Sequence, residues 1–370
     1  MNKNSWILLG VVAVLVAAIV LAQVNTQDRT KQQEALEVAV LLPLSTDFAW
    51  WGESIQHSIE MAQTLGYGKN VKFIYGDTKC NIKDAVNATE SIKALHPSVH
   101  IFIVGCDDDL KAMMPILDKN KDLAFIVGLS GADLYETDFP IINLAYRLET
   151  EATAAASFAS KELGVKTLGI IANNTNFGGV LSTSIEKYFQ NIGGTTTIER
   201  IKYNDPNPET AVLKVLQGKP DAVYIHNDIP TIAAILKRLN QMGYTGKRIV
   251  YYGGRDQSLI DAAGAAAEGL YVPWPISDAT STIRERFVTS FKETYKKDPF
   301  ITAYFMYDGI MLLDEASKSC GNNVRCIESY FYNKKDFIGT LGKLMCQPNG
   351  EVDRSFYFEQ VRNGKFSPVE

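Results

Sequence analysis

The side chains best placed for binding chemistry in this sequence follow short apolar runs. Trp50 and Trp51 come soon after the run Val38–Leu42, and three aspartates at 107–109 follow the run 101–104. In open α/β sheets, ligands bind outside the carboxyl ends of the strands. The tryptophans could therefore form the wall of a binding cleft, or they could pack against a neighbouring loop. The aspartates could hold a cation, or they could accept hydrogen bonds from the free N–H groups of a following helix.

No signature of catalysis accompanies these residues. The sequence contains no G-x-G-x-x-G, G-x-x-x-x-G-K-[ST], G-x-S-x-G or H-E-x-x-H motif. The four histidines (57, 96, 100 and 226) lack metal-ligand spacing, so we expect no metal and no cofactor. An enzyme would need a paired acid and base, which only Asp228 with Asp256 could supply. We therefore expect a binding protein and not an enzyme.

Length, composition and charge limit the class of protein further. The chain has 370 residues, of which 46% are hydrophobic and 21% charged. That length exceeds one ordinary hydrophobic core and suits two lobes. The formal net charge is −5 and no basic patch is present, which argues against a nucleic-acid partner.

Apolar runs alternate with helical patterns along most of the chain. In the first part the strand-like runs lie at 71–75, 101–104, 124–127 and 141–144, and the helical patterns at 83–95 and 110–117. The same order restarts near Glu149 and continues to residue 272. Continuously apolar runs are typical of strands covered on both faces, as in parallel sheets. The sequence thus predicts an α/β fold of two Rossmann-like lobes, with a binding cleft between them.

The last part of the chain has a different pattern. Long helical patterns at 283–296 and 301–318 precede a hairpin-like piece with strands at 355–358 and 365–366. These helices have no sheet of their own nearby, so we expect them to return and cover the first lobe. Several crossings between the lobes would make a hinge.

The N-terminus predicts export. After Lys3, the run Trp6–Ala22 carries no charge, and Val20–Ala22 fits the small-residue pattern of a signal-peptide cleavage site. Residues 1–22 therefore form a signal peptide or a retained membrane anchor, and the polar residues 23–36 form a linker. Either alternative places the globular part in the periplasm or on the extracellular face of the membrane.

The five cysteines agree with an oxidising compartment. Cys80 and Cys106 lie near the ends of successive strand-like runs, so a bridge between neighbouring loops is plausible, and Cys320 and Cys326 suit a small local loop. Cys346 is left over, and is either buried or a reactive thiol. The alternative for each pair is two reduced cysteines in the core.

Several short motifs, in order, resemble one known family. They are PLST…WWGESIQHSIEMA from Pro43, Asp77–Cys80, IVGCDDD at 103–109, FIVGLSGADL at 125–134, Asn176–Gly178, Ala266–Gly269, and Thr302–Ala303 with Tyr307–Gly309. From about Glu37 onward, the chain resembles the type I periplasmic solute-binding proteins of ABC importers, in the branched-chain amino-acid-binding (leucine/isoleucine/valine-binding-like) branch. Each motif alone is weak, and the resemblance rests on their order across the chain.

The resemblance implies a Venus-flytrap with parallel sheets in two lobes and a three-stranded hinge. Lobe 1 would span 37–147 and lobe 2 148–274; residues 275–336 would return to lobe 1, and 337–370 would supply hinge and lobe 2. The hinge crossings would fall near Arg147–Glu149, Pro273–Ile276 and Asp336–Gly339. The family pattern also implies a Cys80–Cys106 disulfide. Hinge bending would close the lobes on a ligand.

The resemblance also implies ligand-binding positions. Trp51 matches an aromatic wall of the first lobe, and Phe177 an aromatic of the second lobe that closes over the ligand. Gly128 and Ser130 match a loop that holds an α-ammonium and a carboxylate, for which a helix cap is the alternative role of Ser130. Asp228 follows the next strand, and Arg255 or Asp256 falls where the family places an acid for the ammonium.

Two departures from the family pattern change the expected ligand. Asp107 and Asp108 stand where the family has small hydroxyl residues, and a carboxylate there disfavours a ligand carboxylate. Arg255 in place of an acid would disfavour an ammonium. We therefore expect a small polar ligand, an amino acid or a related, amide-like or cationic compound. The expected partner is an ABC permease in the membrane, and the protein is expected to be a monomer. The alternative function is a membrane-anchored, ligand-sensing ectodomain.

Overall fold

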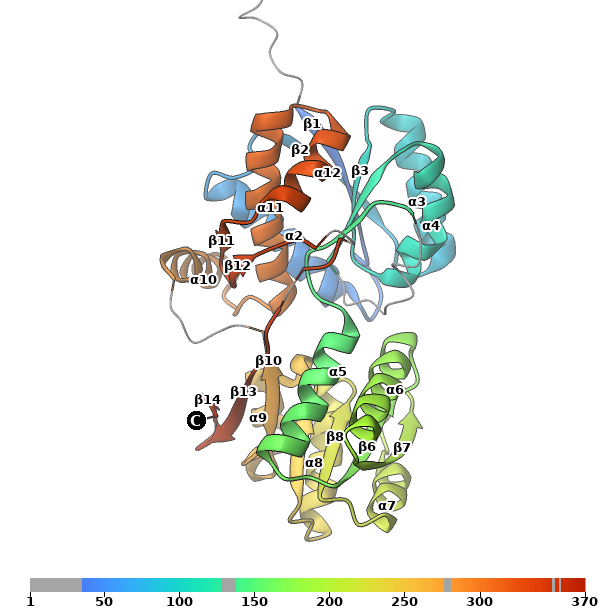
Figure 1. Ribbon diagram of the computed structural model, residues 1–370, viewed down its shortest axis with the longest axis vertical. Coiled ribbons are helices and arrows are strands. Elements are labelled where there is room, and N and C mark those ends of the chain that lie inside the picture. Colours follow the sequence, from blue (N-terminus) through green and yellow to red (C-terminus); the bar gives the residue numbers. More distant parts are fainter. Residues whose placement is uncertain (1–34, 128–137, 276–280, 348–349, 353, 370) are drawn as a thin grey trace, which may run out of the picture.

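The computed structural model describes residues 35–127, 138–275, 281–347, 350–352 and 354–369. The N-terminal segment, and the loop that contains Gly128 and Ser130, lie outside these ranges. The chain forms two lobes, one above the other, with the C-terminus on the lower lobe (Figure 1). Within the described ranges, no helix has the length and apolar character needed to cross a membrane.

The first lobe contains a parallel five-stranded sheet in the order β2-β1-β3-β4-β5. The strands are β1 (Leu36–Leu42), β2 (Val71–Asp77), β3 (Ile101–Val104), β4 (Leu123–Ile126) and β5 (Ile141–Asn143). Two helices cover one face, α3 (Ile82–Leu95) and α4 (Asp107–Lys119). The other face is covered by α2 (Ala49–Thr64), α10 (Thr282–Tyr295), α11 (Ile301–Cys320) and α12 (Val324–Asn333). The helices after residue 281 thus return to the first lobe, as the sequence predicts.

Strand β1 explains why the apolar runs are continuous. Val38, Val40 and Leu42 belong to the core beneath α2 and α11, whereas Ala39 and Leu41 belong to the core beneath α3 and α4. Successive side chains of a strand point to opposite faces, so a strand between two helical layers needs apolar residues at every position.

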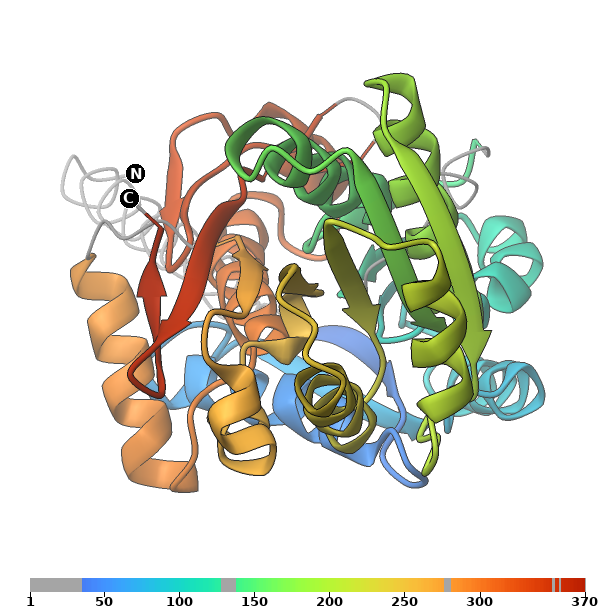
Figure 2. The same cartoon turned by 90° about the horizontal axis from the view of Figure 1, so that it is seen from below.

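The second lobe contains a seven-stranded sheet in the order β14-β13-β10-β9-β8-β6-β7. The strands are β6 (Thr167–Asn173), β7 (Thr195–Ile201), β8 (Ala222–His226), β9 (Lys247–Val250), β10 (Tyr271–Trp274), β13 (Tyr357–Arg362) and β14 (Lys365–Pro368). The first five are parallel, and the β13–β14 hairpin adds an antiparallel edge. Helices α5 (Leu148–Ser157) and α6 (Asn176–Asn191) cover one face, and α7 (Glu209–Gln217), α8 (Ile229–Gln241) and α9 (Gln257–Ala263) cover the other (Figure 2).

The chain passes between the lobes three times. The first passage lies between β5 and α5, and the second between β10 and α10. The third was expected near Asp336–Gly339, but there the chain enters the hairpin of β11 (Phe337–Gly339) and β12 (Gly342–Leu344). That hairpin packs in the first lobe, because Asp308 of α11 accepts a hydrogen bond from Thr340 N at 2.6 Å. The third passage follows Val352 and descends to β13 (Figure 1).

Two disulfides join Cys80 to Cys106 and Cys320 to Cys326, the pairs expected from the sequence. Cys346 is buried, and burial raises the pKa of its thiol to about 12. The thiol is therefore protonated at neutral pH. Of the two alternatives for Cys346, the structure favours a buried cysteine over a reactive thiol.

Candidate functional site

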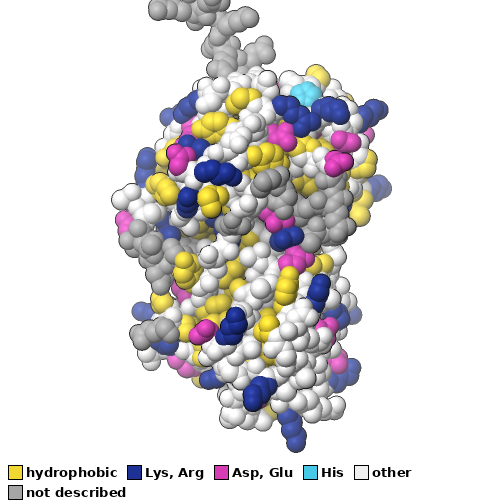
Figure 3. All heavy atoms as spheres, viewed as in Figure 1, with side chains coloured by type: hydrophobic (Ala, Val, Ile, Leu, Met, Phe, Trp, Pro, Cys, Tyr) yellow, Lys and Arg dark blue, Asp and Glu magenta, His cyan; other side chains and the backbone are white. Residues whose placement is uncertain are grey.

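A cavity of about 740 Å³ lies between the lobes, where loops at the carboxyl ends of both sheets face one another. The first lobe lines it with residues of α2, of the segment that leads into α11 and of α11 itself: Trp50, Glu53, Ser54, Lys297, Phe300 and Tyr304. The second lobe lines it with residues that follow β7, β8 and β9, and with β10: Tyr203, Asp228, Tyr251, Arg255, Asp256 and Trp274. Hydrophobic side chains reach the surface at this waist on the face drawn in Figure 3.

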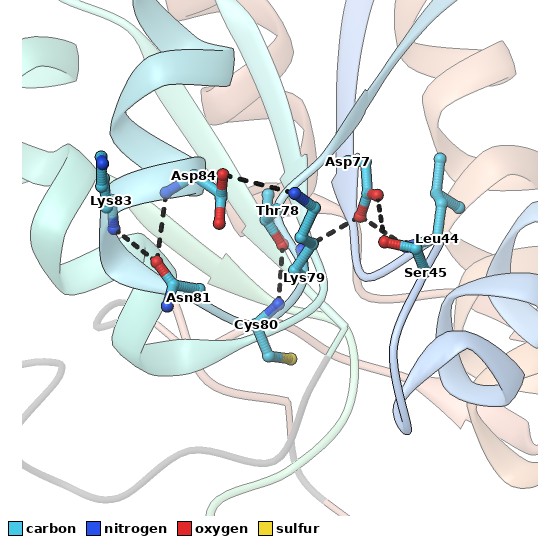
Figure 4. A network of polar contacts seen from close by, with 9 residues as sticks. All are labelled: Leu44, Ser45, Asp77, Thr78, Lys79, Cys80, Asn81, Lys83 and Asp84. Atoms are coloured by element: carbon cyan, nitrogen blue, oxygen red, sulfur yellow. Dashed lines mark hydrogen bonds and ion pairs between the residues drawn. The ribbon is translucent and has the colours of Figure 1, made fainter.

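Asp77, at the end of β2, fixes the loop that leads from β1 into α2 (Figure 4). Its carboxylate accepts hydrogen bonds from Leu44 N at 2.9 Å, Ser45 Oγ at 2.6 Å and Lys79 N at 3.0 Å. Burial acts to raise the pKa of Asp77, but the hydrogen bonds from Ser45 and the backbone outweigh it and lower the pKa. Asp77 therefore stays ionised and holds the start of the tryptophan loop.

The two tryptophans have different places. Trp50 is 45% exposed and lines the cavity. Trp51 is half-buried, and its Nε1 donates to the Gly105 carbonyl at 3.3 Å. The two rings meet edge to face at 5.8 Å, and both contact Phe300. The structure thus places Trp50 at the cavity and uses Trp51 to pack against the β3 loop.

Asp107 and Asp108 lie in the first turn of α4, whose partial positive charge favours carboxylates. Asp107 Oδ1 accepts from Asp108 N at 3.0 Å. Asp108 is exposed, and its Oδ1 accepts from Asn176 Nδ2 at 3.1 Å, across the cleft at the start of α6. Phe48 and Tyr203 also meet across the cleft, with ring centroids 5.6 Å apart. We call these two contacts, Asp108–Asn176 and Phe48–Tyr203, the lip contacts.

Asp109 is an acid whose position the sequence did not distinguish from its neighbours. It is 1% exposed, and burial raises the pKa of its carboxyl to about 6. Its carboxylate lies within 4.8 Å of the sulfurs of Cys80 and Cys106. Those sulfurs are bonded to each other, so they do not offer thiolate ligands for a metal.

Phe177 packs on the second lobe against His226, with ring centroids 4.8 Å apart, and His226 meets Tyr251 edge to face at 4.3 Å. His226 is buried, and burial lowers its pKa to about 3. The imidazole is therefore neutral at physiological pH and serves as part of an aromatic layer. Tyr251 lines the cavity, whereas Phe177 is not among the lining residues.

Asp228 and Asp256 each cap a helix and also line the cavity. Asp228 is the N-cap of α8 and accepts from Thr231 N at 3.5 Å and from Asn204 N at 2.9 Å. Asp256 is the N-cap of α9 and accepts from Ser258 N at 2.8 Å. Both side chains thus satisfy backbone N–H donors at the start of a helix.

Arg255 is held between two rings and an acid. Its guanidinium lies 4.5 Å from the Trp274 ring centroid and 5.5 Å from that of Phe366. It forms a two-point pair with Glu359 of β13, in which Nη2 and Oε1 are 3.0 Å apart and Nε also meets Oε2. The charge of Arg255 is thus compensated by Glu359, so the expectation that it would repel a ligand ammonium does not hold on this geometry.

The sequence did not single out Glu359 or most of the aromatic lining. Glu359 is 104 residues from its partner, and no local pattern links the two. Phe300 precedes the predicted helical pattern 301–318 and Tyr304 lies within it, but nothing in the spacing of these two residues or of Tyr203 marks them as neighbours of Trp50. Position along the chain could have identified two of the lining tyrosines. Tyr203 and Tyr251 follow strands β7 and β9, whose carboxyl ends face the cleft.

The fold and the position of the cavity agree with known proteins. A family model described as a periplasmic binding protein matches residues 35–365. The chain belongs to the periplasmic binding protein family. Curated protein sequences gave no significant match. The match to the family model confirms the resemblance inferred from the ordered motifs.

Solved structures of periplasmic binding proteins share this fold. The leucine-binding protein LivK of Thermotoga maritima is 23% identical; the match covers 90% of this chain and 98% of that one, with a TM-score of 0.80. LivJ of Streptococcus pneumoniae, in complex with isoleucine, is 17% identical over 90% and 97% of the chains, with a TM-score of 0.78. An ABC-transporter solute-binding protein of R. palustris, in complex with benzoate, is 21% identical over 90% and 95%, with a TM-score of 0.77. At these identities the likeness is one of fold.

Proposed function

We propose that this periplasmic binding protein captures a small solute in the cavity between its lobes and delivers it to an ABC importer. The single observation that carries the proposal is the cavity of about 740 Å³, whose lining comes from both lobes. Its size suits a small molecule. Family membership supports the same role.

Closure of the lobes is the mechanism that this arrangement supports. A ligand in the cavity contacts Trp50 and Phe300 on one wall and Tyr203 and Tyr251 on the other. These contacts exist together only when the lobes are close, so the ligand binds the closed state better and shifts the population toward it. The lip contacts, one hydrogen bond and one contact between rings, also join the two lobes and stabilise the closed state.

The remaining parts of the proposal concern place and partners. Family membership supports a location outside the cytoplasm, reached by an N-terminal signal peptide or kept by an N-terminal anchor. The proposed partner is a membrane permease that recognises the closed form, and the proposed working unit is a monomer. No chemical step is proposed: the role is capture and release, not catalysis.

Thermal unfolding of the full chain against a panel of solutes tests the proposal. The panel contains aliphatic amino acids, amides, polyamines, purines and aromatic acids. A ligand that binds only the folded state, at 100 times its Kd, adds about 2.7 kcal/mol to the free energy of unfolding and raises the melting temperature. We expect at least one class to do so, and a melting temperature that no class raises would contradict solute capture.

A further inference from the structure

Aromatic side chains line the cavity from both lobes. Trp50, Phe300 and Tyr304 belong to the first lobe, and Tyr203, Tyr251 and Trp274 to the second. The faces of such rings attract cations, and tryptophan does so most strongly. Trp274 already binds one, because the guanidinium of Arg255 lies 4.5 Å from its ring centroid.

The charges of the lining are unequal. Four carboxylates line the cavity (Glu53, Asp228, Asp256 and Asp298), against two basic side chains (Arg255 and Lys297). Both basic side chains have acidic partners: Lys297 Nζ lies 2.7 Å from Glu53 Oε2, and Arg255 pairs with Glu359. Asp298 pairs with Lys292 at 2.6 Å. Within the described ranges, Asp228 and Asp256 have backbone N–H partners but no ion pair.

Nearby carboxylates add to the effect of burial on two tyrosines of the cavity, Tyr203 and Tyr251. Burial is the first cause that raises the pKa of Tyr251, and Tyr203, Glu151, Asp228 and Asp256 raise it further. For Tyr203, burial again comes first and Asp228 second. The charges of Asp228 and Asp256 therefore reach the rings that a bound ligand would contact.

We propose that the cavity selects an organic cation, a ligand with net positive charge on an apolar body, such as an alkyl- or arylammonium. This rests on the proposed function and names its ligand class. The aromatic faces and the two carboxylates, Asp228 and Asp256, both favour a cation. An aromatic carboxylate of the same size would meet these two acids without a free basic side chain from the described lining, and a zwitterion falls between the two.

Matched ligands test the inference on the full chain. Benzylamine, benzyl alcohol and benzoate share one ring and differ in charge, and choline and 3,3-dimethyl-1-butanol are a second pair of the same shape. Calorimetric titration should give the tightest binding for benzylamine and choline, at least about tenfold tighter than for their neutral counterparts. The affinity for benzylamine should also fall as salt screens the carboxylates.

Variants assign the effect to the two acids. Asp228→Asn and Asp256→Asn keep the helix caps, because asparagine caps as well as aspartate. Each should weaken benzylamine about threefold to fivefold and leave benzyl alcohol unchanged. Asp261→Asn, on the exposed side of α9 and outside the lining, removes the same charge and should change neither.

The outcomes separate the ligand class from the function. Binding of leucine, benzoate or benzyl alcohol in preference to benzylamine and choline overturns the cation inference while solute capture stands. Equal weakening of benzylamine by all three variants overturns the role of Asp228 and Asp256. If no solute of any class binds, solute capture itself fails, and the cation inference fails with it.

Discussion

Asp308 in the first lobe and Glu151 in the second are both fully buried acids, and their carboxyl groups are satisfied in different ways. In the first lobe, Asp308 accepts from the backbone and hydroxyl of Thr340, at 2.6 and 2.7 Å, and from Leu341 N at 3.4 Å. The charge of Arg354 also acts on Asp308 and lowers its pKa, although burial raises the pKa overall. Asp308 therefore ties the β11–β12 hairpin to α11.

Glu151, in the second lobe, lies next to the first hinge passage. Its carboxylate accepts from Tyr146 Oη at 3.3 Å, Tyr224 Oη at 3.2 Å and Tyr252 N at 3.0 Å. No basic side chain is among the groups that shift its pKa, which burial raises to about 7. Tyr146 precedes the passage and Tyr224 and Tyr252 belong to the second lobe, so Glu151 joins groups on both sides of the hinge. The difference teaches that one buried acid has a basic side chain, Arg354, among the groups that act on it, whereas the other has none and is about half protonated near pH 7.

The largest expected effect comes from Asp308→Ala. It leaves two N–H groups and a hydroxyl without their acceptor, and it removes the acid whose charge acts on the half-buried Arg354. We expect the free energy of unfolding to fall by about 3–5 kcal/mol in chemical denaturation. Asp308→Asn keeps an acceptor and should cost less. A loss below about 1 kcal/mol for both variants would contradict the anchor role.

The second prediction uses pH to test the raised pKa of Glu151. Between pH 4.5 and about 7, folded Glu151 keeps a proton that the unfolded chain has lost, so its contribution to stability falls as pH rises. The loss is about 3 kcal/mol across this window. Glu151→Gln should remove this slope, so the stability of the variant relative to the natural chain should increase from pH 5 to pH 8.

Other groups also contribute to the natural pH profile, and Asp308 is one of them because burial raises its pKa too. Asp109, with its pKa raised to about 6, adds a smaller slope of the same sign. His226, with its pKa lowered to about 3, loses stability in the opposite direction, as pH falls below 6.5. When the pH profile of Glu151→Gln is subtracted from that of the natural chain, the contributions of these other groups cancel. Parallel stability profiles for the two proteins would contradict the raised pKa of Glu151.

The third prediction concerns the Arg255–Glu359 pair, which lies on the second-lobe wall of the cavity. On the second wall, Glu359→Gln removes the compensation of Arg255 beside the cavity. We expect a loss of about 1 kcal/mol in stability, since the pair is partly exposed, and about threefold weaker binding of benzylamine. Glu199→Gln, which breaks an exposed pair with Lys214 in the same lobe, is the matched control and should change neither quantity. Unchanged benzylamine affinity in Glu359→Gln would show that the Arg255 charge does not reach the ligand.

The smallest expected effect concerns the lip contacts. Asn176→Ala removes the hydrogen bond to Asp108, which exists only when the lobes are close. We expect about twofold to threefold weaker ligand binding, with the melting temperature of the ligand-free protein unchanged. Asn191→Ala, at the other end of α6, is a control that should leave the affinity unchanged. A lower ligand-free stability with unchanged affinity would assign Asn176 a role within its own lobe.

The sequence predicted the layers of the fold better than the contacts of the site. Continuous apolar runs such as Val38–Leu42 reveal a strand buried on both faces, because periodicity is a local property. The third hinge passage lies after Val352 and not near 336–339 as predicted, because Asp308 holds the β11–β12 hairpin in the first lobe. That contact is long-range, so no local pattern in the sequence reveals it. Which tryptophan lines the cavity depends on a hydrogen bond from Trp51 to Gly105, which turns Trp51 to the β3 loop. The charge of Arg255 is compensated by Glu359, which lies on a strand near the C-terminus.

One measurement tests the central claim, that a solute in the cavity draws the lobes together. Small-angle X-ray scattering of the full chain would be recorded without ligand, with saturating benzylamine and with saturating benzoate. The account predicts a smaller radius of gyration with benzylamine than without ligand, and a smaller change or none with benzoate. Tight binding of benzylamine with an unchanged scattering curve would contradict closure, and compaction by benzoate alone would contradict the assigned ligand class.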